Sequence, residues 1–266
     1  VQHGQFRDAL NCFERMKNEG LSPDAITFIS VLKACGGTGA LVKGKQIHDE
    51  IVNRGLLEKD IVLGTTLVDM YAKCGMITKA HKVLKELPIR NVVSWNALIA
   101  GYAEQGQCHE ALNCLQWMQT EGLSPDKVTF VSILSACSHS GRLYEAQVLF
   151  ENMTTKYYVI PKLEHHISMV VVFGCAGRFD QAMSVIKMMP SCDYPVIWRT
   201  ILGACKKWGN VKLGKLAFDQ SIQVDNTCAS AYVLMAEIFA AAGMQEDAQK
   251  VEDMRQRHTG VAKAGQ

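Results

Sequence analysis

Eight glycines recur along the chain at intervals of 31 to 36 residues, and a small residue stands five positions after each of them. Glycine adopts the left-handed backbone conformation that ends many helices, and a small residue lets a neighbouring helix approach closely. The pattern therefore predicts a series of helical hairpins. The glycines are Gly4, Gly39, Gly75, Gly106, Gly141, Gly177, Gly209 and Gly243, and the small residues are Ala9, Gly44, Ala80, Ala111, Ala146, Ala182, Gly214 and Ala248.

Apolar residues recur at helical spacing on both sides of these glycines. In one unit, Trp95, Leu98 and Ile99 precede the glycine, and Leu115 and Met118 follow it. Neither helix of such a hairpin can bury its apolar face alone, so neighbouring hairpins must stack. The sequence predicts an all-α protein, a right-handed α-solenoid of stacked helix-turn-helix repeats with almost no β structure.

The glycine spacing also divides the chain into repeats. A partial repeat occupies residues 1–24, so the sequence starts within a repeat, which predicts a fragment with any targeting peptide lying upstream. The further limits are 25–60, 61–91, 92–126, 127–162, 163–194 and a final pair of repeats in 195–262, followed by a tail at 263–266.

Composition excludes several classes of protein. The chain has 266 residues, of which 48% are hydrophobic and 20% charged, values that predict a folded globular protein. No apolar run is long enough to span a bilayer, and we expect no membrane partner. The ten cysteines form no CxxC pair, so we expect reduced thiols within the core. A net charge of +2 is too small to indicate nucleic-acid binding by itself.

Catalytic motifs are incomplete or absent. His48 and Glu50 form an H-x-E sequence, but a zinc deaminase also needs a P-C-x-x-C motif. His165 and His166 are adjacent and point to different faces of a helix, so packing is the better interpretation than metal binding. We find neither a P-loop nor a G-x-S-x-G motif. The sequence predicts no catalytic residue, no metal and no cofactor, and hence a specificity module rather than an enzyme.

The order of repeat lengths indicates the family. The lengths cycle through about 36, 31 and 35 residues, whereas tetratricopeptide repeats keep a period of 34. Together with "NVVSWNALIAGYAEQGQCHEALNCLQWMQTEGLSPD", "TFISVLKACGGTGALVKGKQIH", "TTLVDMYAKCG" and "LEHHISMVVVFGCAGRFDQA", this cycle resembles the PLS class of plant pentatricopeptide-repeat (PPR) proteins. By resemblance the complete repeats are of type L, S, P, L and S, and 195–262 holds two E-type, tetratricopeptide-like repeats.

The resemblance implies single-stranded RNA binding with one base per repeat. It further implies a mitochondrial or chloroplast protein that acts as the specificity module of a C-to-U RNA editing factor, with the deaminase domain absent from this chain. The implied protein partner is a deaminase-bearing protein or one of the multiple-organellar-editing-factor type.

In the family, the fifth and last residues of a repeat read the base. The repeat 92–126 offers Asn96 and Asp126, a pair that by resemblance prefers U over C. An amide can meet both the O4 and the N3–H of uracil, and Asp126 can hold it in one orientation. The repeat 61–91 offers Thr65 and Asn91, which by resemblance prefer A.

Two aliphatic residues, Val62 and Val93, lie three positions before the readers and are suited to sandwich a base. The remaining repeats offer weaker RNA-contact candidates: Ile29 with Asp60, Val131 with Lys162, Ile167 with Tyr194, and Asp24 without a partner.

Alternatives remain open at this stage. A polar residue near a helix start is commonly a cap, and Asp60 and Asp126 can serve as N-caps. The whole chain can also be a protein-binding solenoid of the tetratricopeptide type, or an RNA splicing or stability factor without an editing role.

Overall fold

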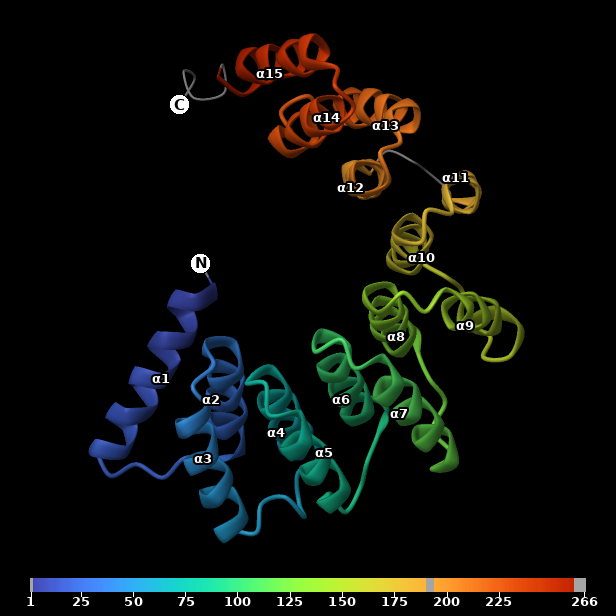
Figure 1. Cartoon of the computed structure of the whole chain (residues 1–266). Coiled ribbons are helices and arrows are strands. Elements are labelled where there is room, and N and C mark those ends of the chain that lie inside the picture. The colour runs from blue at the N-terminus through green and yellow to red at the C-terminus, as the bar shows by residue number, and fades with distance from the viewer. Residues whose placement is uncertain (1, 190–193, 261–266) are drawn as a thin grey trace. The chain divides into compact units, whose positions relative to one another are not determined.

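The computed structural model describes residues 2–189 and 194–260, and within them it contains fifteen helices and no strand (Figure 1). This confirms the all-helical fold. Pro190 and the tail at 263–266 lie outside the described residues. The helices are α1 (Gln2–Asn18), α2 (Ala25–Thr38), α3 (Leu41–Asn53), α4 (Ile61–Lys73), α5 (Ile77–Glu86), α6 (Val92–Glu104), α7 (Cys108–Thr120), α8 (Lys127–Ser140), α9 (Leu143–Thr155), α10 (Leu163–Cys175), α11 (Phe179–Met188), α12 (Pro195–Trp208), α13 (Val211–Val224), α14 (Ala229–Ala241) and α15 (Gln245–Gly260).

The chain divides into two compact units, each a stack of hairpins. The first comprises Val1–Ala136 and Tyr157–Val159, and the second Cys137–Lys156 and Ile160–Gln266. In the first unit α2, α4 and α6 pack against one another in sequence, and α3, α5 and α7 form a second row beside them (Figure 1). In the second unit α10, α12 and α14 make the equivalent row, packed with α11, α13 and α15. Within each unit this is a solenoid arrangement.

Seven of the eight turn glycines have the backbone conformation that the sequence predicts. Their φ angles lie between 65° and 77°, in the left-handed region that favours glycine. Gly4 is the exception, because it lies inside α1 and marks no turn. The confirmed glycines are Gly39, Gly75, Gly106, Gly141, Gly177, Gly209 and Gly243.

Small residues after the turns permit close packing, as predicted. A Cβ atom added at Gly44 would lie 2.6 Å from Sδ of Met70. Ala80 and Ala111 are completely buried in the corresponding places of α5 and α7. Six of these positions are therefore sterically restricted or buried, whereas Ala9 and Ala248 are half-buried.

The predicted apolar stripes form the core. Trp95, Leu98 and Ile99 of α6 are buried, as are Leu115 and Met118 of α7. The cysteines that the structure describes are all free thiols, and most are buried. These buried side chains hold consecutive hairpins together. In the first turns of α2, α4, α6 and α8, by contrast, one apolar side chain is exposed.

Candidate nucleic-acid interface

Asn96 is a buried amide in an otherwise apolar part of α6. Its side chain is only 7% exposed, so its polar atoms need partners within the protein or in a ligand. The Nδ2 atom donates to Oδ1 of Asp126 at 3.0 Å. The structure therefore brings together the two predicted readers, which are thirty residues apart in the sequence.

A third residue, Thr129, completes this cluster. Its side chain is fully buried, and its Oγ1 donates to Oδ1 of Asn96 at 2.6 Å. The same hydroxyl accepts the backbone N–H of Asp126 at 3.1 Å. The sequence analysis missed Thr129. A signal was available, because Ser94 occupies the same third position of the preceding repeat and also carries a hydroxyl.

Asp126 has two roles in this cluster. Its Oδ1 accepts the backbone N–H groups of Val128 and Thr129, each at 3.0 Å, and so caps the start of α8. Burial disfavours the charged form, but the hydrogen bonds from Thr129, Asn96 and Val128 more than offset it and lower the pKa of Asp126. The group is thus a carboxylate at neutral pH and acts as an acceptor only. The amide nitrogen of Asn96, not its oxygen, must face it.

The Asn96 amide keeps part of its hydrogen-bonding capacity. A primary amide has two N–H groups and two lone pairs on its oxygen. Asp126 occupies one N–H and Thr129 one lone pair. One donor and one acceptor are left, which is the complement of the O4 and N3–H of uracil.

The Thr65 and Asn91 pair differs from this arrangement. Oγ1 of Thr65 is buried and has no hydrogen-bond partner. Oδ1 of Asn91 accepts the backbone N–H of Ser94 at 2.9 Å, and Ser94 Oγ accepts the backbone N–H of Asn91 at 3.0 Å. This reciprocal capping box directs Asn91 to the start of α6. No direct hydrogen bond therefore joins the Thr65 hydroxyl to the side chain of Asn91.

An exposed aliphatic side chain occupies the second position of the first helix in each of four repeats, which are helices α2, α4, α6 and α8. The predicted Val62 and Val93 are 54% and 60% exposed. Ile26 and Val128, which the sequence analysis did not include, occupy the same position of α2 and α8 and are 73% and 47% exposed. These exposed side chains supply apolar surface against which an unpaired base can pack.

The weaker candidates behave mainly as structural residues. Oδ1 of Asp24 accepts the backbone N–H of Thr27 at 2.8 Å, and Oδ1 of Asp60 accepts that of Val62 at 2.9 Å, so both are N-caps. The others range from half-buried to exposed. The half-buried group is Ile29, Val131 and Ile167, and the exposed group is Lys162 and Tyr194.

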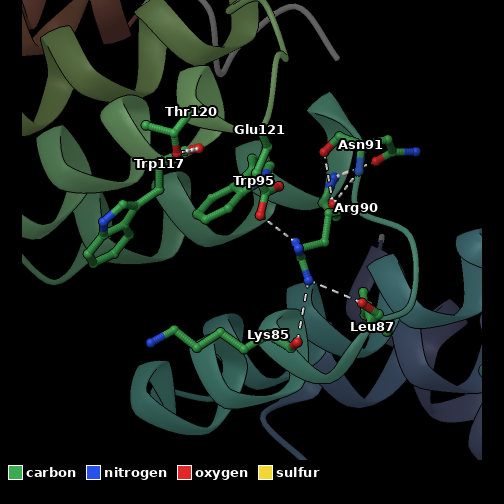
Figure 2. Close-up of polar contacts among 9 residues, drawn as sticks. Lys85, Leu87, Arg90, Asn91, Trp95, Trp117, Thr120 and Glu121 are labelled. Carbon is green, nitrogen blue, oxygen red and sulfur yellow. Dashed lines mark hydrogen bonds and ion pairs between the residues drawn. The ribbon is translucent and has the colours of Figure 1, made fainter.

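An ion pair fixes the chain just before Asn91 (Figure 2). Nε of Arg90 donates to Oε1 of Glu121 at 2.7 Å, and its Nη1 donates to the carbonyl oxygen of Leu87 at 3.2 Å. The other oxygen of Glu121 accepts Nε1–H of Trp95 at 2.9 Å. This single carboxylate therefore connects the end of α7 to both α6 and the loop that precedes it.

Several lysines of the kind that could contact RNA phosphates form ion pairs within the chain. Lys43 pairs with Glu14, and Lys73 with Asp69 at 2.7 Å. Lys206 pairs with Glu237 at 2.8 Å. Such exposed pairs add little stability, but they partly neutralise the basic groups. Any recognition of RNA by this chain thus depends on local polar groups more than on overall charge.

Other kinds of site are not evident in the described part of the chain. His165 is buried, and its Nδ1 accepts the backbone N–H of Lys162 at 3.0 Å. His166 contacts the ring of Phe150, which agrees with a packing role. Among the described residues no group of three or more His, Cys, Asp or Glu side chains is placed to hold a metal ion. None of the described helices has the length and apolar character needed to cross a membrane.

Comparison with known proteins identifies the family. The sequence matches the PPR repeat family over residues 90–139, the pentatricopeptide repeat domain over 1–38, and the PPR repeat over 65–92, 128–157 and 166–194. The chain belongs to the pentatricopeptide-repeat family.

Relatives and solved structures agree with this assignment. The chain is 36% identical to the chloroplastic pentatricopeptide repeat-containing protein CRR2 of Arabidopsis thaliana, over 99% of this chain and 40% of that protein. It is 34% identical to the mitochondrial protein At1g77170 of the same plant, over 94% of this chain and 54% of that protein. The chain spans about half the length of its curated relatives, or less. The fold is similar to PPR10 in complex with an 18-nt psaJ RNA element, with a TM-score of 0.74, 16% identity, and coverage of 97% of this chain and 38% of PPR10.

Proposed function

We propose that the chain binds single-stranded RNA in a sequence-specific manner, with one base per repeat. The hydrogen-bonded cluster of Asn96 and Asp126 carries the proposal. A buried amide held by a carboxylate, with one donor and one acceptor left over, suits a uracil edge. The exposed Val62 and Val93 support it, because unpaired bases need apolar surfaces on which to stack.

We further propose that the repeat 61–91 binds adenine. The Thr65 hydroxyl is buried without a partner, and such a group costs free energy unless a ligand or water satisfies it. An adenine edge offers both an acceptor at N1 and a donor at N6. With the N-terminal repeats toward the 5′ end of the RNA, the preferred dinucleotide is 5′-AU-3′.

The names of the relatives support an organellar setting. Some carry chloroplastic and others mitochondrial names, so we place this protein in one of these organelles. The class and limits of the repeats, including the two E-type repeats in 195–262, remain predictions from the sequence. On that basis the chain directs C-to-U editing by a deaminase supplied elsewhere or by a partner protein.

Selection from a random single-stranded RNA pool tests this function. The chain is incubated with the pool at several salt concentrations, and bound RNAs are sequenced. We expect enrichment of 5′-AU-3′ and affinity that falls as salt rises. Binding to no RNA, together with binding to an extended peptide, would instead assign the chain to protein-binding solenoids. Binding with no base enrichment would refute the reading of single bases.

A further inference from the structure

We infer that Thr129 is a specificity-determining residue: its hydroxyl locks the Asn96 amide in the orientation that accepts U and rejects C. This inference rests on the proposed function of Asn96 as a base reader. Thr129 belongs to the next repeat along the chain, so the base at this step would be read by a cluster that spans a repeat boundary.

The contacts of Asp126 direct the Thr129 proton toward Asn96. Oδ1 of Asp126 already accepts three N–H groups, from the side chain of Asn96 and the backbones of Val128 and Thr129. The Thr129 hydroxyl lies 3.0 Å from this crowded oxygen but 2.6 Å from Oδ1 of Asn96. A hydroxyl has one proton to donate, and the shorter contact, to the less crowded oxygen, receives it.

The orientation of the amide decides between the two pyrimidines. Uracil presents an acceptor at O4 beside a donor at N3, whereas cytosine presents a donor at N4 beside an acceptor at N3. Rotation of the Asn96 amide by 180° exchanges its oxygen and nitrogen, and so exchanges the preferred base. In the rotated state the amide oxygen would face the Asp126 carboxylate, and the Thr129 hydroxyl would exchange its 2.6 Å contact with the amide oxygen for the longer 3.0 Å contact with Oδ1 of Asp126. Two residues thus oppose this rotation, and Thr129 contributes the one hydrogen bond that the Asp126 carboxylate cannot.

The preceding repeat supplies a matched control. Ser94 has the same place at the start of α6 and makes the same capping contact, accepting the backbone N–H of Asn91 at 3.0 Å. It makes no contact with the hydroxyl of Thr65, which has no partner. Replacement of Ser94 therefore removes a helix cap alone, whereas replacement of Thr129 removes a cap and the lock on the amide.

The test compares RNA pairs that differ only by U or C at the step read by Asn96. Thr129→Val keeps the volume and removes the hydroxyl, Thr129→Ser keeps the hydroxyl, and Ser94→Ala is the control. We expect Thr129→Val to reduce the ratio of U to C affinities by about two- to ten-fold, the worth of one hydrogen bond. Thr129→Ser and Ser94→Ala should keep the wild-type ratio. Loss of affinity for both RNAs in equal proportion would overturn the inference and leave Thr129 as a cap.

Circular dichroism first checks that each variant is folded. If Thr129→Val fails to fold, the side-chain amide protons of Asn96 in the wild type decide the matter by NMR. Slow rotation and protection from exchange in the free protein would support the lock, and rapid reorientation would overturn it. If the wild type itself does not distinguish U from C, the proposed function fails instead, and the two failures are thereby separated.

Discussion

Gly101 offers a direct test of how consecutive repeats are held together. It lies in α6, where α6 packs on α4 of the preceding repeat. A Cβ atom added at Gly101 would lie 2.6 Å from Cβ of Ala72 and 2.7 Å from Cδ1 of Ile77. Ala72 has no flexible side chain that could move away. The substitution Gly101→Ala must therefore displace one helix relative to the other.

The magnitude follows from two opposing effects. Insertion of a methyl group into a packed core costs about 1–3 kcal/mol. The higher helix propensity of alanine returns about 1 kcal/mol. We expect Gly101→Ala to lower the free energy of unfolding by about 0–2 kcal/mol.

Gly203→Ala is the control for helix propensity. Gly203 lies in α12, and a Cβ atom there would meet no atom within 4 Å. This substitution should raise the free energy of unfolding of the region around α12 by about 1 kcal/mol. Because repeat arrays can unfold in parts, urea unfolding is followed both by circular dichroism and by hydrogen exchange of the local helices. Equal stabilisation by both substitutions would refute the packing of α6 on α4 described above.

Further predictions concern acid stability, helix capping and base stacking. Burial lowers the pKa of both His48 and His81, so the unfolded chain binds more protons as the pH falls. The stabilisation that these neutral histidines provide should be fully present above their ordinary pKa of 6.5 and should be lost as the pH falls below it. We therefore expect a lower urea midpoint at about pH 5.5 than at about pH 7.5. Asp60→Ala removes the cap of α4 and should cost about 1 kcal/mol by urea unfolding, with a smaller loss for Asp60→Asn. Val93→Ala should weaken RNA binding without changing either the preferred base or the melting temperature, since Val93 is exposed; an unchanged affinity would exclude its role in stacking.

Periodicity made the fold predictable. The turn glycines and the apolar stripe of Trp95, Leu98 and Ile99 are local signals, and equivalent residues recur in the other repeats. Errors at one repeat are therefore corrected by the others. Gly4 is where the prediction from spacing was wrong, because this glycine lies inside α1 and not at a turn.

The site was predictable only in part. The repeat register placed Asn96 and Asp126 at the fifth and last positions of one repeat, and the structure joins them by a hydrogen bond. The same register did not reveal that Asn91 would cap α6 through Ser94 and leave the Thr65 hydroxyl without a partner. Whether a side chain turns toward a helix end or toward its neighbour depends on rotamers and competing donors, which spacing does not encode. Thr129 was missed although Ser94 carries a hydroxyl at the same position of the preceding repeat, because that hydroxyl alone does not show which side chain it contacts.

The central claim is that Asn96 and Asp126 together read one base. Asn96→Thr combined with Asp126→Asn converts this pair into the types found at Thr65 and Asn91. Binding of the wild type and the double variant is measured against four RNAs that differ only in the base at this step. The account predicts a change of preference from U to A with the neighbouring step unaffected. An unchanged preference for U, in a variant that is folded, would contradict it.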